Sequence, residues 1–224
     1  YRDLPIVSSG YTRVFTIARE IVEKNDGKID ENIIENFIKK YEEVTPLYMR
    51  EIWNLGVTLR ISLIEKIRKI SEEIVRTYSK WEQAEKWLED YNENSELRLP
   101  GVDDNYSFYE HLAFKLRRMG KDGIIVLNRI DNYIEKYGTS IEAISRKEHS
   151  IQAEMKISIG NSIPSLKYIS NINWNELFNK ISEIENIFNT EKSGIYPKMD
   201  LESKNAYRSK VEKIAKTFEI SELR

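Results

Sequence analysis

The apolar residues between positions 67 and 91 recur at alternating intervals of three and four residues for more than three heptads. This spacing places one row of side chains along a single face of an α-helix, whereas a half-buried strand needs an interval of two. The pattern predicts one long helix, over about residues 57–91, with a packed seam. The seam consists of Ile67, Ile70, Ile74, Thr77, Trp81, Ala84, Leu88 and Tyr91.

Helical spacing also dominates the remainder of the chain, which contains only 9 Gly and 5 Pro in 224 residues. We expect an all-α fold, a multi-helix bundle with one long central helix and a second helical sub-bundle. Further helices are expected at residues 11–24, 31–41, from 46 onward, and at 106–119, 122–137, 140–159, 164–170, 174–188 and 201–218. Their expected N-caps include Asp30, Thr45, Thr139, Asn173 and Asp200.

Residues 92–105 form the most polar and turn-rich stretch, with Pro100 and Gly101 followed by two aspartates. We interpret this stretch as the main loop or a sub-domain boundary within one helical accessory domain, residues 1–224. The chain begins at Tyr1, and residues 221–223 resemble the start of another helix. These two features indicate a fragment of a larger protein.

Composition narrows the classes of function. The formal charge of −2 gives no long-range attraction for phosphate backbones, which disfavours nucleic acid as a partner. The absence of cysteine excludes disulfides and thiolate zinc sites. No apolar run approaches the roughly 20 residues that span a bilayer, so we expect a soluble chain without a membrane span.

Catalytic motifs are absent from the sequence. It contains no zinc-protease, P-loop, dinucleotide or serine-hydrolase motif, and no D-x-D pair of the kind that holds a divalent ion in many glycosyltransferases. The Glu110–His111 and Glu148–His149 pairs do not converge by themselves, because adjacent helical residues point about 100° apart. We assign no catalytic residue, no metal ligand and no cofactor to this chain.

Two groups of residues are candidates for ligand or partner binding. Trp81, Trp87 and Tyr91 are hypothesised to form a sugar-stacking platform, although the seam positions of Trp81 and Tyr91 favour core packing. The polar turn at residues 160–162 is expected to break the helix, and its Asn161 and Ser162 are hypothesised to hydrogen-bond a neighbouring domain or a saccharide hydroxyl.

Several ordered segments resemble the N-terminal cytoplasmic region of bacterial cyclic β-1,2-glucan synthases. The stretch from about residue 92 to residue 140 carries no matching motif. The segments that carry the resemblance are Leu4-Pro5, Gly10-Tyr11-Thr12-Arg13-Val14, Asp26-Gly27-Lys28-Ile29-Asp30, Val44-Thr45-Pro46-Leu47 with Glu51 and Trp53, Leu59-Arg60, Leu63-Ile64-Glu65 with Arg68, Gly160-Asn161-Ser162-Ile163, Ser165-Leu166 with Trp174, Gly194-Ile195-Tyr196, Met199-Asp200, Tyr207-Arg208 and Val211-Glu212.

The resemblance implies a membrane-associated parent glycosyltransferase that polymerises glucose from UDP-glucose with a divalent cation, both handled in another domain. It implies that this chain is a non-catalytic scaffold at the cytoplasmic face of the bacterial inner membrane, with other domains of the same polypeptide as partners. Two alternatives stay open. The chain is a glucan- or partner-binding helical module, or, less favoured, a self-contained carbohydrate hydrolase.

Overall fold

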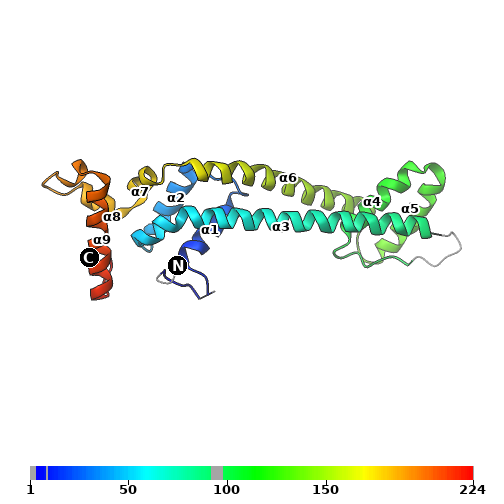
Figure 1. Ribbon diagram of the computed structural model, residues 1–224. Coiled ribbons are helices and arrows are strands. Elements are labelled where there is room, and N and C mark those ends of the chain that lie inside the picture. The colour runs from blue at the N-terminus through cyan, green and yellow to red at the C-terminus, as the bar shows by residue number, and fades with distance from the viewer. Residues whose placement is uncertain (1–3, 9, 92–97, 224) are drawn as a thin grey trace. The chain divides into compact units, whose positions relative to one another are not determined.

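The computed structural model describes residues 4–8, 10–91 and 98–223, and helices dominate these ranges (Figure 1). Within them, an isolated antiparallel bridge between Ile6 and Thr12 is the only extended pairing. The predicted all-α class is therefore confirmed. The elements are α1 (Arg13–Lys24), α2 (Glu31–Glu42), α3 (Met49–Asp90), α4 (Tyr106–Arg118), α5 (Gly120–Glu135), α6 (Ile141–Asn171), α7 (Trp174–Ile181), α8 (Glu183–Asn189), the short 3-10 helix η1 (Tyr196–Lys198) and α9 (Leu201–Phe218).

The chain divides into two compact units. Unit 1 comprises Tyr1–Ile67 and Gly160–Arg224, and unit 2 comprises Arg68–Ile159, so that α3 and α6 contribute residues to both. The predicted boundary at residues 92–105 does not coincide with this division. Its residues 92–97 lie outside the described ranges, and its residues 98–105 lie inside unit 2.

Unit 1 has its own hydrophobic core, formed by the apolar faces of α1, α2, α7 and the first half of α3. Ile17 and Ile21 of α1, Ile34 of α2, and Leu59 and Leu63 of α3 are each at most 2% exposed. Burial of an aliphatic side chain of this size contributes about 1.5–3 kcal/mol. These helices are therefore held by packing of their apolar stripes, as their spacing predicts.

Unit 2 is built around a second core between α4, α5 and the adjoining parts of α3 and α6. Tyr109, Leu112 and Leu116 supply the buried face of α4, while Ile130 and Ile134 supply that of α5. The Tyr109 hydroxyl donates a hydrogen bond to the Pro100 carbonyl oxygen, which ties the loop before α4 to this core.

Three predicted helix starts are confirmed by side-chain caps. The carboxylate of Asp30 accepts from the Ile33 amide at 2.9 Å, and that of Asp200 accepts from the Ser203 amide at 2.7 Å. Asn173 caps α7 in the same way. A cap supplies an acceptor for a backbone N–H that the first turn of a helix leaves without a partner.

The start predicted at Thr45 is wrong, because α3 begins at Met49. In place of Thr45, two glutamates accept hydrogen bonds from the backbone amides at the start of α3 and just before it. Glu51 accepts from the Tyr48 amide at 3.0 Å, and Glu222 accepts from the Met49 amide at 2.8 Å. The helix predicted from residue 46 and the long helix are consequently one element of 42 residues, about 63 Å at roughly 1.5 Å per residue.

The predicted helix break at residues 160–162 is also wrong, because α6 continues through Pro164 to Asn171. Pro164 has no N–H to donate to the carbonyl of Gly160, which costs one helical hydrogen bond. Tertiary contacts offset this loss. Ser162 and Ser165 are 0% and 4% exposed, and the Ser165 hydroxyl accepts from the Ile29 amide at 2.8 Å.

Two smaller differences have local causes. The helix predicted over residues 174–188 is divided at Ser182, whose backbone is extended and whose hydroxyl accepts from the Glu185 amide at 3.4 Å. Ser140 caps α6 in place of Thr139, with its hydroxyl accepting from the Ala143 amide at 3.3 Å. In both cases a serine hydroxyl satisfies an amide of a first helical turn.

Candidate functional site

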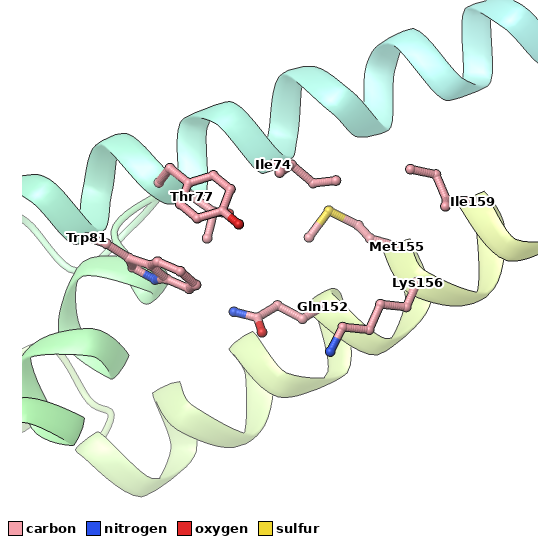
Figure 2. A pocket seen from close by; sticks show the side chains of 8 residues that line it. Ile74, Thr77, Trp81, Gln152, Met155, Lys156 and Ile159 are labelled. Atoms are coloured by element: carbon pink, nitrogen blue, oxygen red, sulfur yellow. The ribbon is translucent and has the colours of Figure 1, made fainter.

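A hollow in unit 2 lies between the 74–81 part of α3 and the 152–159 part of α6. Its volume is about 350 Å³, and its surface is mainly apolar. Figure 2 shows side chains from the two helices pointing toward one another across it, with Trp81 and Gln152 at one end and Ile159 at the other. It is lined by Ile74, Thr77, Tyr78, Trp81, Gln152, Met155, Lys156 and Ile159.

Trp81 is the predicted site residue that the structure places in this hollow. Its ring stacks on His111 of α4, with centroids 5.2 Å apart, and meets Tyr78 edge-on at 5.1 Å. The His111 ring also lies 3.1 Å, through Nε2, from a carboxylate oxygen of Glu85. Trp81 is thereby fixed by α4 and contributes to the wall of the hollow.

The other two members of the hypothesised aromatic platform lie elsewhere in unit 2. Trp87 and Tyr91 stack on each other at 4.9 Å and pack against the core of the unit. The Trp87 indole N–H donates to the Arg98 carbonyl oxygen at 3.0 Å, and the Tyr91 hydroxyl accepts from Arg129 at 2.6 Å. Their polar groups and one face of each ring are engaged within the chain, so the structure does not join them to Trp81.

Asn161 and Ser162 lie in unit 1 on α6. The Asn161 amide donates to the Asp26 carbonyl oxygen at 3.2 Å, and Ser162 is 0% exposed. Asn161 thus holds α6 against the segment that precedes α2. Their hypothesised role in contacting a saccharide or another domain stays a prediction.

The histidines form pairs with glutamates from other helices. His149 Nε2 lies 3.4 Å from a carboxylate oxygen of Glu110, which joins α6 to α4. Throughout the described ranges, no group of three or more His, Asp or Glu side chains is arranged to hold a metal ion.

A buried ion pair joins α1 to the start of α3 in unit 1. Arg13 contacts both carboxylate oxygens of Glu51, and its Nε donates at 2.9 Å. The side chain of Glu51 is 0% exposed and that of Arg13 is 15% exposed. The hydrogen bond with Glu51 raises the pKa of Arg13 further above its ordinary value, so the guanidinium stays charged.

A second buried polar cluster joins α8, η1 and α9. Arg208 lies 2.8 Å from Glu185 Oε2, and the Tyr196 hydroxyl donates to the same oxygen at 2.9 Å. Arg208 also donates to Asn179 at 3.0 Å and lies 4.7 Å above the Phe178 ring. Burial, followed by the hydrogen bond to Glu185, raises the pKa of Tyr196 to about 12.

Glu42 lines a separate charged hollow of about 420 Å³ in unit 1, between the end of α2 and α8. One of its oxygens accepts from the Leu47 amide at 3.3 Å. Burial, with a smaller contribution from the nearby carboxylate of Glu183, raises the pKa of Glu42 to about 7. This carboxyl therefore titrates close to neutral pH.

Sequence reasoning missed the α6 side of the unit 2 hollow. Ile74, Thr77 and Trp81 are seam positions, but no pattern pairs them with Gln152 or Lys156, which are separated from them by more than 70 residues. It also missed the partners of Arg13 and Arg208. For Arg13 the sequence did contain an indication of its partner, because Arg13 and Glu51 both lie in segments that carry the family resemblance.

The geometry defines an all-α chain with a mainly apolar hollow in unit 2, and with a charged hollow and buried ion pairs in unit 1. Its sequence is similar to that of cyclic beta-(1,2)-glucan synthase NdvB of Rhizobium meliloti (strain 1021), with 25% identity over 228 residues. The similarity covers 96% of this chain but only 8% of the length of the relative. No family model matches the chain. Among the described residues, no helix is both long enough and apolar enough to cross a membrane.

Proposed function

We propose that this chain is a non-catalytic helical accessory domain of a membrane-associated glucosyltransferase that makes cyclic β-1,2-glucan from UDP-glucose. The observation that carries the proposal is the similarity to the glucan synthase over nearly the whole chain. UDP-glucose and its divalent cation are bound by other domains of the parent, and this chain serves as a scaffold for those domains at the cytoplasmic face of the membrane.

The buried polar contacts of unit 1 support a structural role for the segments that resemble the synthases. Arg13 and Glu51 belong to two such segments, as do Ile29 and Ser165, and each pair is joined by a hydrogen bond. Contacts of this kind fix the positions of helices relative to one another, because a buried polar group that loses its partner costs about 1–3 kcal/mol. They account for these residues without assigning them any part in catalysis.

The test is to incubate the purified chain with UDP-glucose and Mg²⁺ or Mn²⁺ and to measure UDP release and glucan formation. We expect neither product above a blank without protein. Sustained turnover that scales with the amount of chain would contradict the non-catalytic assignment. Hydrolysis of linear β-1,2-glucan by the chain alone would instead favour the hydrolase alternative.

A binding module is the second candidate function. It is favoured by one specific observation, the mainly apolar hollow of unit 2 with Trp81 in its wall. The lining and the size of this hollow support this second candidate function.

A further inference from the structure

The unit 2 hollow has the composition of a small-ligand site. Its volume of about 350 Å³ falls within the roughly 300–1,000 Å³ of ligand pockets, which combine apolar walls with a few polar groups that set orientation. Ile74, Met155 and Ile159 supply aliphatic surface, while Trp81 and Tyr78 supply aromatic surface. A ligand that fits must therefore present apolar faces.

The indole N–H of Trp81 indicates that the ligand also carries acceptors. Trp81 Nε1 is buried and has no hydrogen-bond partner among the described residues. The indole N–H groups of Trp87 and Trp174, in contrast, donate to the carbonyls of Arg98 at 3.0 Å and Ile169 at 3.2 Å. A buried donor without a partner is uncommon in folded proteins, and a ligand oxygen would satisfy it once the ring turns enough to expose the N–H to the hollow.

The polar groups around the hollow favour a neutral ligand rich in hydroxyls. The Gln152 amide donates to the carboxylate of Glu148 at 2.9 Å, which fixes the amide and leaves its oxygen able to accept. Thr77 and Lys156 add a hydroxyl and an ammonium donor. The buried carboxylate of Glu148 lies behind Gln152 and disfavours an anion at that end. Donors and acceptors together suit hydroxyls, which act as both.

We propose that this hollow binds a short stretch of linear β-1,2-glucan. The C–H face of a glucose unit packs against Trp81 and the aliphatic side chains, a glucan hydroxyl accepts from Trp81 Nε1, and the Gln152 oxygen accepts from another hydroxyl. The choice of β-1,2-linked glucose rests on the proposed function. The prediction of a neutral saccharide rests on the hollow itself.

The indole N–H signals of the ¹⁵N-labelled chain test the proposal directly. Titration with linear β-1,2-gluco-oligosaccharides up to millimolar concentration should shift the Trp81 signal downfield, because its proton gains an acceptor. The Trp87 signal should stay unchanged, because that N–H already has one. Each signal is assigned by its disappearance from the spectrum of the corresponding variant, Trp81→Phe or Trp87→Phe.

Calorimetry on the same variants provides the affinity. Trp81→Phe keeps a ring and removes the donor, so binding should weaken roughly three- to tenfold, the effect of one hydrogen bond. Trp81→Ala should abolish detectable binding, and Trp87→Phe serves as the matched control with unchanged affinity. Circular dichroism establishes that each variant keeps its helical content.

Absence of both heat and signal shift would overturn the proposal, as would equal affinity of wild type and Trp81→Ala. A Trp81 signal that responds to a protein fragment of the parent and not to any saccharide would overturn it too, by making the hollow a protein contact. These failures leave the scaffold function intact. If instead β-1,4-linked gluco-oligosaccharides bind and β-1,2-linked ones do not, the proposal of a β-1,2-glucan site is overturned, and the hollow is a site for a different saccharide.

Discussion

Replacing Arg208 by methionine is the perturbation that most sharply tests the buried cluster of unit 1. Arg208 and Glu185 are 4% and 1% exposed. In this variant the buried carboxylate of Glu185 loses the guanidinium. The Tyr196 hydroxyl is then the remaining hydrogen-bond partner of its Oε2. Loss of one member of a buried ion pair typically costs 3–5 kcal/mol, so we expect the free energy of unfolding of unit 1 to fall by about that amount.

The assay is urea unfolding followed by tryptophan fluorescence. Trp53 and Trp174 report on unit 1 once Trp81 and Trp87 of unit 2 are replaced by phenylalanine. Lys24→Met is the control, because Lys24 and its partner Glu20 are 64% and 45% exposed and such a pair contributes at most about 1 kcal/mol.

The double variant Glu185→Met with Arg208→Met refines this test. It removes both charges, and apolar replacements of a buried pair are often close to neutral. We therefore expect the double variant to be more stable than Arg208→Met by more than about 1 kcal/mol. A loss below about 1 kcal/mol in the single variant, or additive losses in the double variant, would refute the assignment of a buried pair.

Three further predictions concern unit 1. Because the pKa of Glu42 is raised from its ordinary 4.5 to about 7, the stability that its protonation provides is complete below pH 4.5 and is lost as the pH rises to 7. Glu42→Gln should thus flatten the decline in unfolding free energy between pH 5 and pH 8 by about 1–2 kcal/mol, less than the full shift implies because the carboxyl is partly exposed; an unchanged decline would contradict this. Gly56→Ala should cost about 1–3 kcal/mol in urea unfolding, since its Cβ would lie 2.7 Å from the Trp174 ring. Gly160→Ala, where a Cβ meets nothing within 4 Å, should instead stabilise the chain by about 0.5–1 kcal/mol, and the same sign for both variants would refute the packing argument. Ser165→Ala removes the acceptor of a buried backbone N–H and should cost about 1–3 kcal/mol, whereas a neutral result would show that another group replaces the hydroxyl.

Local chemistry explains which features could be predicted from the sequence. The caps Asp30 and Asp200 act on amides three residues away, so the residues themselves reveal the helix start. The start of α3 was misplaced because Glu222, distant in sequence, supplies an acceptor for the Met49 amide. The continuity of α6 likewise depends on a contact between Ser165 and Ile29, which local propensity does not contain.

The candidate site was predicted in part. The seam spacing placed Trp81 on one helical face with Ile74 and Thr77, and these three residues do line the hollow. The same spacing did not distinguish a packed core position from the wall of a hollow. That distinction depends on how far apart α3 and α6 lie, which is a property of the tertiary structure.

The most direct test of the central proposal uses the relative. In NdvB of Rhizobium meliloti, the stretch similar to this chain is either deleted or replaced by these 224 residues, and the cyclic β-1,2-glucan that the cells make is measured. The scaffold role predicts that deletion abolishes synthesis, with the protein still produced by the cells, and that replacement restores it. Full synthesis after deletion would contradict the proposal.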